Sequence, residues 1–227
     1  MSVYAIADLH GQYGLWQQVK EFLGEDDVLY ILGDCADRGP DGWKIIKEAL
    51  TDPRVIYLRG NHEQMLLDSW RYDWCDNYLW YCNGGEETFN ALLMDVNYEI
   101  YLRQLSKTKL WESYVNTSGK KIFLSHAGWT LMQDNEIPSK EELLWDRSHI
   151  NCNWWSEKKP DTYMVHGHTP VITGRFKVAP TGKINENETM IKYCHDHKIC
   201  IDACSAYTNK IGLLNLDTLE IEKEFEI

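Results

Sequence analysis

Residues 55–63 read VIYLRGNHE, a short apolar run that stops at a glycine and a group of polar side chains. Two earlier stretches have the same design, VYAIADLHG at residues 3–11 and VLYILGD at residues 28–34. Residues 15–23 and 43–50, which lie between these runs, carry apolar side chains at helical spacing. The alternation predicts β-α-β-α-β units and therefore an α/β fold.

Polar clusters also follow two apolar runs in the second half of the chain. They read SHAG at residues 125–128 and HGHT at residues 166–169, and glycines in all the clusters suit tight turns after a strand. Ligands of α/β sheets bind outside the carboxyl ends of the strands, so polar side chains that follow different strands converge there. We expect one shared site that contains Asp8, His10, Asp34, Asn61, His126 and His168.

The expected site combines carboxylate, amide and imidazole groups and has no thiolate. Such a set suits Mn, Fe, Zn, Ni or Co better than Ca, which prefers oxygen ligands. Six ligands are too many for one catalytic metal with open positions, but they suit two metals that share a bridging carboxylate. A single histidine or aspartate at a strand end is usually a structural turn residue. It is the recurrence in five clusters that favours a dinuclear metal centre.

The length and net charge of the chain limit the number of domains and the kinds of partner that we expect. The chain has 227 residues, which suits one domain over residues 1–227, and its formal net charge is −12. Such a charge repels nucleic acid phosphates, so we expect no nucleic acid partner. No apolar run approaches the ~18 residues of a membrane helix, so we expect no membrane partner. The seven cysteines form no C-x-x-C pair and the N-terminus lacks a basic leader region, which together predict a cytoplasmic protein with free thiols.

Five motifs resemble those of the phosphoprotein phosphatase family, within the calcineurin-like metallophosphoesterases. In chain order they are DLHG at 8–11, GDCADRG at 33–39, GNHE at 60–63, HAG at 126–128 and GHT at 167–169. The motif WDR at 145–147 and the short chain are most similar to the small bacterial and phage phosphatases, including that of phage lambda. The resemblance implies two packed mixed β-sheets flanked by helices.

The resemblance also implies a role for each matching residue. One metal ion would be held by Asp8, His10 and Asp34, and the second by Asp34, Asn61, His126 and His168. Mn²⁺ is the expected ion, and Fe, Zn, Ni and Co also suit these ligands. His62 would act as general acid, held by Asp37. The phosphoryl oxygens would be held by Arg38, Arg59 and Arg147.

The activity implied by the resemblance is the hydrolysis of phosphate monoesters by direct attack of a bridging metal hydroxide. The expected substrates are phosphoserine and phosphothreonine in proteins or peptides, and small phosphate esters. The alternative is a symmetrical diadenosine tetraphosphate hydrolase, a family that usually lacks an acid at the position of Asp37. Asp37 therefore favours the monoesterase, and the complete ligand set disfavours an inactive binding module.

Four further segments lead to expectations about structure. Residues 84–107 are mostly helical in pattern. Within residues 70–81, a helical stripe of four aromatic side chains predicts a core-facing surface, with a stacking wall for substrate as the alternative; the four are Trp70, Trp74, Tyr78 and Tyr81. The polar segment 173–197 is interpreted as a surface insertion rather than a flap over the site. Residues 201–206, IDACSA, replace the glycine-rich turn that the resemblance implies.

Overall fold

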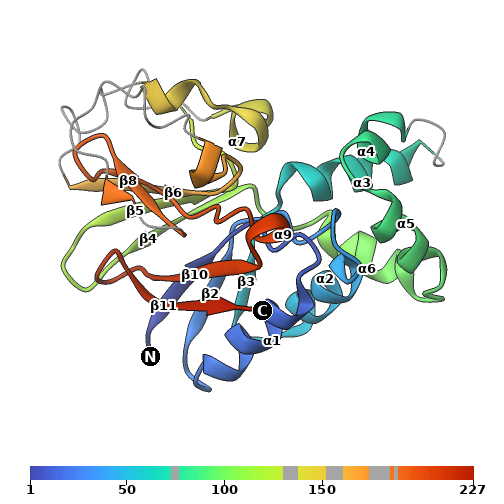
Figure 1. Cartoon of the computed structure of the whole chain (residues 1–227), viewed down its shortest axis with the longest axis horizontal. Helices are drawn as coiled ribbons and strands as arrows, with labels where there is room; N and C mark the ends of the chain where they lie inside the picture. Colours follow the sequence, from blue (N-terminus) through green and yellow to red (C-terminus); the bar gives the residue numbers. More distant parts are fainter. Residues whose placement is uncertain (73–76, 130–137, 152–160, 174–184, 187–188) are drawn as a thin grey trace.

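Two β-sheets lie at the centre of the structure, with helices along their outer sides (Figure 1). The computed structural model describes residues 1–72, 77–129, 138–151, 161–173, 185–186 and 189–227. Among these residues, no helix has the length and apolar character needed to cross a membrane.

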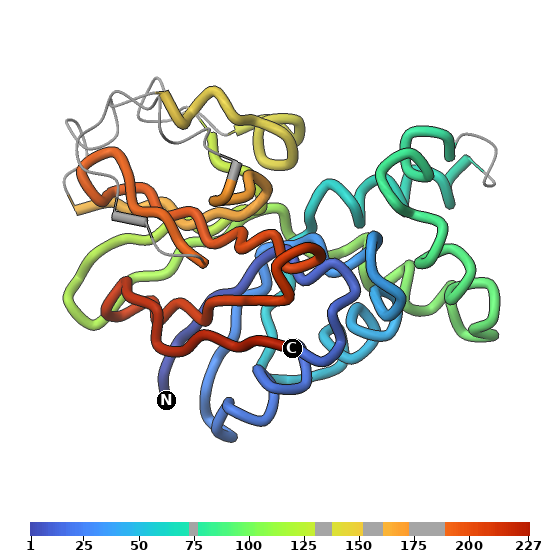
Figure 2. The backbone as a smooth tube through the Cα atoms, viewed as in Figure 1, coloured from blue at the N-terminus to red at the C-terminus, as the bar shows by residue number. Residues whose placement is uncertain are grey.

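The first sheet contains the β-α-β-α-β unit predicted from the sequence. Its strands in spatial order are β11 (Glu220–Glu226), β10 (Lys210–Asn215), β1 (Val3–Ile6), β2 (Val28–Ile31) and β3 (Val55–Tyr57). β1, β2 and β3 are parallel and are joined by α1 (Tyr13–Phe22) and α2 (Gly42–Thr51). β10 pairs with β1 in the antiparallel sense, so the C-terminal segment lies beside the N-terminal one (Figure 2).

The second sheet is also mixed. Its strands in spatial order are β4 (Trp111–Val115), β5 (Lys121–Ser125), β6 (Thr162–His166), β9 (Lys198–Cys200), β8 (Ile191–Tyr193) and β7 (Asn185–Glu186). β5, β6 and β9 are parallel, whereas β4 and β8 run antiparallel to their neighbours. The predicted α/β fold with two packed mixed sheets is therefore confirmed. The polar segment 173–197 contributes β7 and β8 to the sheet, which differs from a simple surface insertion; its residues 174–184 and 187–188 lie outside the described residues.

Side chains of β1 alternate between two hydrophobic cores. Ala5 faces the layer between the sheets, together with Leu124 of β5 and Val165 of β6. Ile6 faces the opposite side, in the core that contains Leu15 of α1 and Ile45 of α2. Because both faces of the strand are covered, the run is apolar throughout rather than alternating, as is typical of buried parallel strands.

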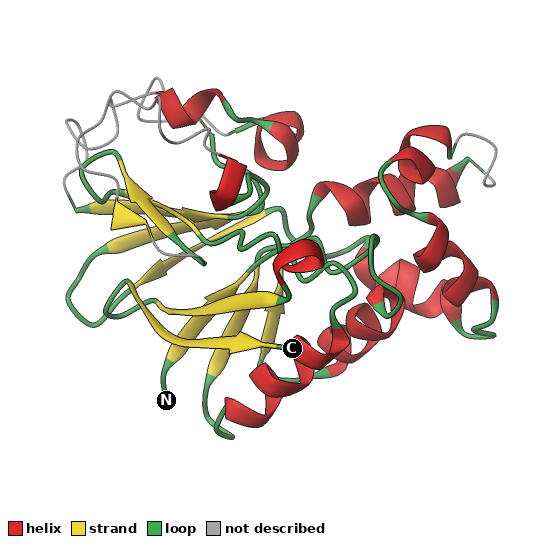
Figure 3. Ribbon diagram, viewed as in Figure 1, coloured by secondary structure: helices red, strands yellow, loops and turns green. Residues whose placement is uncertain are grey.

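A helical lobe follows β3 and lies beside the sheets (Figure 3). Its helices are α3 (Asn61–Arg71), α4 (Tyr78–Cys82), α5 (Glu86–Leu93) and α6 (Tyr98–Leu105), so the helical prediction for residues 84–107 is confirmed. The predicted aromatic stripe is wrong in one respect: Tyr78 is 79% exposed, whereas Trp80, outside the stripe, is buried. Trp74 lies outside the described residues.

The remaining short helices lie near the carboxyl ends of the strands. They are α7 (Lys140–Trp145), η1 (Ser148–Asn151), η2 (Val171–Thr173) and α9 (Ser205–Thr208). Backbone hydrogen bonds join the loops that follow the strands of each sheet: His10 N–H donates to the Asp34 carbonyl at 2.9 Å, and Gly167 N–H to the His126 carbonyl at 2.8 Å. These loops form the candidate functional site.

Candidate metal centre and active site

Polar residues after β1, β2 and β6 adopt the left-handed backbone conformation. The φ angles are 56° at Asp8, 43° at His10, 54° at Asp34 and 64° at His168. This region is uncommon for residues other than glycine and costs about 1–3 kcal/mol per residue, so it persists only where the surroundings impose it. Its recurrence in four predicted ligands indicates that the loops are shaped for a site.

Glycines in the same loops serve two different purposes. Gly33 has a φ angle of 86°, as expected for a tight turn. At Gly60 and Gly167 the reason is close approach: a Cβ atom would collide with the Asp34 carboxylate at the first position and with the Asp8 carboxylate at the second. The two carboxylates are therefore packed directly against glycine backbone.

Four predicted ligands gather at one end of the site. His126 Nε2 lies 2.7 Å from Asn61 Oδ1, 3.1 Å from His168 Nδ1 and 3.3 Å from Asp34 Oδ2. His168 Nδ1 is also 3.0 Å from Asn61 Oδ1. The Nδ1–H of His126 donates to the Leu32 carbonyl at 2.8 Å, which leaves Nε2 directed at the cluster. This is the usual arrangement for a histidine that ligates a metal through its other nitrogen.

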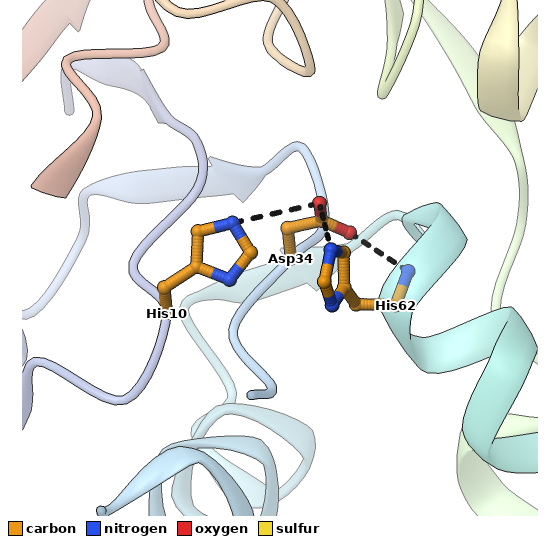
Figure 4. Close-up of side chains that lie close together, drawn as sticks. All are labelled: His10, Asp34 and His62. Carbon is orange, nitrogen blue, oxygen red and sulfur yellow. Dashed lines mark hydrogen bonds and ion pairs between the residues drawn. The ribbon is translucent and has the colours of Figure 1, made fainter. Parts of the chain in front are cut away.

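The second group of side chains surrounds the other side of the Asp34 carboxylate (Figure 4). His10 Nε2 and His62 Nε2 lie 3.7 Å and 3.8 Å from Asp34 Oδ2, and His62 N–H donates to Oδ1 at 3.0 Å. The Nδ1–H of His10 donates to the Ala36 carbonyl at 2.8 Å. Asp34 thus belongs to two groups of metal-competent atoms, one with His10 and His62, the other with His126 and His168.

Asp8 and the three arginines predicted to bind phosphate each make different contacts around the site. The Asp8 carboxylate accepts the backbone N–H of His168 at 3.1 Å. The Arg38 guanidinium donates to His10 Nε2 at 2.8 Å and to His62 Nε2 at 3.0 Å, and Arg147 donates to the His168 carbonyl at 3.1 Å. Arg59 donates instead to the Ser106 carbonyl at 3.3 Å.

His62 and Asp37 form a buried ion pair next to the clusters. His62 Nδ1 lies 2.7 Å from Asp37 Oδ2, and both side chains are almost fully buried. Burial alone would lower the pKa of His62, but the carboxylates of Asp34 and Asp37 raise it above its ordinary value. The geometry leaves Nε2 of His62 as the nitrogen that faces the Asp34 side of the site.

Three buried carboxylates and the His126 imidazole influence one another in these loops. Burial, together with the charge of Asp202, raises the pKa of Asp8 well above its ordinary value. Burial raises the pKa of Asp202 to about 6. Burial would also raise the pKa of Asp34, but the nearby imidazoles of His126 and His62 hold it well below its usual range. Conversely, burial would lower the pKa of His126, and the Asp34 and Asp8 carboxylates raise it to about 9.

The residues of the two groups fit divalent metal ions. Imidazole nitrogens and amide and carboxylate oxygens face one another at about 3 Å in a buried space, where their lone pairs repel unless a cation or proton lies between them. The nitrogen of His168 that faces this space is Nδ1. A mixed nitrogen and oxygen set without thiolate suits first-row transition ions such as Mn, Fe or Zn.

Two residues of the site were not assigned from the sequence. Asp202 follows β9 as Asp34 follows β2, so the same strand-end pattern could have identified it. Its Oδ1 accepts the Cys204 N–H at 2.8 Å, and Cys204 adopts a φ angle of 60° where the resemblance implied glycine. Glu63 was part of the quoted motif GNHE, but its role becomes visible only in three dimensions.

Glu63 holds the loop that contains Asp34. Its buried carboxylate accepts backbone N–H groups of Asp34 at 2.9 Å, Cys35 at 2.8 Å and Ala36 at 3.1 Å. It also accepts the N–H of Gly60 at 2.9 Å, which is the glutamate half of a capping box at the start of α3. Glutamate at the third position of α3 was the sequence signal for this contact.

Glu63→Gln is expected to reduce the free energy of unfolding by about 3 kcal/mol, because the amide NH₂ would face two of the four backbone donors. Urea denaturation measures the change. Glu142→Gln is the matched control, since Glu142 closes the corresponding but exposed capping box of α7 and should lose less than about 0.5 kcal/mol. Equal effects of the two substitutions would show that the Glu63 contacts do not stabilise the loop.

Comparisons with known proteins bear on this site. The family model of calcineurin-like phosphoesterases matches residues 1–203. Serine/threonine-protein phosphatase 2 of Salmonella typhimurium is 30% identical over 155 residues, which cover 65% of this chain and 69% of that protein.

Solved structures share the fold at low sequence identity. A protein described as a candidate diadenosine tetraphosphatase has a TM-score of 0.67 at 17% identity, covering 98% of this chain and 92% of that one. A protein serine/threonine phosphatase from Saccharomyces cerevisiae has a TM-score of 0.56 at 14% identity, covering 100% of this chain and 80% of that one.

The matched segment contains the strands β1 to β9. It also contains every side chain of the two metal-competent groups that share Asp34. The similarity to the bacterial serine/threonine-protein phosphatase supports membership of the phosphoprotein phosphatase family. With its two mixed sheets and its metal-competent groups at the strand ends, the chain belongs to the calcineurin-like phosphoesterases, within their phosphoprotein phosphatase family, and is a phosphatase.

Proposed function

We propose that this phosphatase hydrolyses phosphate monoesters, with phosphoserine and phosphothreonine in peptides or proteins as its principal substrates. The observation that carries the proposal is the buried His62–Asp37 pair, with 2.7 Å between His62 Nδ1 and Asp37 Oδ2. An alkoxide leaves as a strong base and benefits from a positioned acid, whereas a nucleotide phosphate released from an anhydride is a much weaker base. A dedicated acid therefore favours the ester substrate.

The proposed metal ligands are those that the motifs predict. Asp8, His10 and Asp34 would hold one divalent ion, and Asp34, Asn61, His126 and His168 the second, with Mn²⁺ as the expected metal. Bound there, the two ions would polarise the phosphoryl oxygens and lower the pKa of water. The position of Asp34 in both candidate groups supports its role as the shared ligand.

The proton path is assigned to His62. Its Nδ1–H donates to Asp37, so the proton for the leaving oxygen would come from Nε2. In the structure this nitrogen accepts a hydrogen bond from Arg38. We propose that Arg38 exchanges its imidazole contacts for phosphoryl oxygens when substrate binds, which frees Nε2 to carry the proton.

The other arginines would complete the phosphate site. The Arg147 guanidinium already donates a hydrogen bond to the carbonyl oxygen of His168. Arg59 remains a prediction from the motif, because its guanidinium donates to Ser106 in the structure.

A substrate panel with Mn²⁺ tests the proposal. Phosphoserine and phosphothreonine peptides should give kcat/KM values at least about tenfold above those for diadenosine tetraphosphate and for a phosphodiester. p-Nitrophenyl phosphate serves as the activated reference ester, and chelator-treated protein as the blank. A higher kcat/KM for diadenosine tetraphosphate than for both peptides would instead assign the chain to anhydride hydrolysis.

A further inference from the structure

We propose that Trp80 is a positioning residue for phosphate-ester hydrolysis, because its indole N–H fixes the carboxylate that orients His62. The inference rests on the roles of His62 and Asp37 proposed above. Trp80 lies in α4, outside every motif quoted for the strand ends, and its side chain is only 1% exposed.

A single oxygen of Asp37 links the two aromatic donors. Trp80 Nε1 donates to Asp37 Oδ2 at 2.8 Å, and His62 Nδ1 donates to the same oxygen at 2.7 Å. Asp37 Oδ1 is buried without a hydrogen-bond partner among the described residues. The orientation of the carboxylate is therefore determined at Oδ2, and within the described part of the chain, loss of the indole donor would leave the imidazole as the side-chain donor that holds it.

Neighbouring residues of the helical lobe fix the position of the indole ring. A Cβ atom at position 85 would collide with the indole nitrogen, so only glycine allows the ring to lie there. The ring packs edge to face against Phe89, with 6.0 Å between centroids. Thr88 Oγ1 accepts the N–H of Asp37 at 2.8 Å, and the Gly84 carbonyl accepts the N–H of Arg38 at 3.1 Å.

Through these contacts the helical lobe supports the loop that contains Asp37 and Arg38. Asp37 and Arg38 have φ angles of 69° and 66°, so their loop needs external contacts to keep its shape. The segment from Trp80 to Thr88 supplies them. A neutral indole suits this position because it donates to a carboxylate without adding a charge that would compete with His62 for the ion pair.

Trp80→Phe removes the donor and keeps most of the aromatic volume. We expect kcat for a phosphoserine peptide to fall about tenfold or more, and kcat for 2,4-dinitrophenyl phosphate to change less than about threefold, because a good leaving group needs little proton transfer. Mn²⁺ affinity, measured by calorimetry, should stay within about twofold, since no proposed ligand is touched. A purely structural defect would lower both kcat values in the same proportion.

Trp43→Phe is the matched control. Trp43 is also buried, and its Nε1 donates to a carboxylate, Asp95, at 3.0 Å, but Trp43 lies in α2 and Asp95 follows α5. Its replacement should leave the ratio of the two kcat values unchanged. If Trp80→Phe fails to fold, benzothienylalanine at position 80 replaces the N–H by sulfur in a ring of similar size and gives the same comparison.

His62→Asn in the same substrate series separates the two levels of the argument. If His62→Asn spares the activated ester and Trp80→Phe does not differ from Trp43→Phe, the inference about Trp80 is overturned while the role of His62 stands. If His62→Asn lowers kcat equally for both esters, the proposed acid itself fails. Selective loss in both His62→Asn and Trp80→Phe supports the inference.

Discussion

His62→Asn is expected to lower kcat for phosphoserine and phosphothreonine peptides about 10²–10⁴-fold, the range for loss of a general acid. Asparagine can still donate one hydrogen bond to the Asp37 carboxylate, but it cannot deliver a proton to an alkoxide. The fold should persist, because the His62 backbone N–H keeps its contact with Asp34. Steady-state kinetics with purified protein in Mn²⁺ measures the loss.

The metal content of the same variant decides between two roles for His62. The imidazole lies close enough to His10 and Asp34 to count as a ligand by distance alone. Its Nδ1 is engaged by Asp37, however, and its Nε2 by Arg38. We therefore expect full metal content in His62→Asn and reduced content in His10→Asn. Metal loss of the same size in both variants would make His62 a ligand and refute its assignment as the acid.

Much of the fold could be predicted because its signal is local. Buried parallel strands are apolar on both faces, so β1, β2 and β3 appear as uninterrupted runs in the sequence. The side chains after these runs meet because parallel strands share a carboxyl edge. The same rule, applied to the run before Asp202, would have added this residue to the site.

Other features depend on contacts that a pattern does not contain. Gly60 and Gly167 read as turn residues, but in the structure they make room for carboxylates. The exposure of Tyr78 and the burial of Trp80 depend on how a five-residue helix docks, which helical spacing alone does not determine over so short a stretch. The guanidinium of Arg59, predicted at the phosphate, is directed by the neighbouring carbonyl of Ser106.

Removal of divalent metal is expected to reduce activity to background, and Mn²⁺ should restore it. Without cations, burial raises the pKa of Asp8 and of Asp202, and repulsion from neighbouring carboxylates, Asp202 and Asp34 for Asp8 and Asp34 for Asp202, raises it further. Cations that bind only the folded chain relieve this repulsion and stabilise it, by about 2.7 kcal/mol at a free concentration 100 times Kd. Dialysis against a chelator, elemental analysis and thermal unfolding measure metal content, activity and stability together.

Calcium is the control for this experiment, because an ion that prefers oxygen ligands gains little from the imidazoles of His10, His126 and His168. Ca²⁺ should therefore restore neither the unfolding temperature nor the turnover that Mn²⁺ restores. If protein shown by elemental analysis to lack metal still hydrolysed phosphoserine peptides at its original rate, the clustered imidazoles and carboxylates would have to be a structural polar network. The proposed two-ion chemistry would then be wrong, whatever the family of the chain.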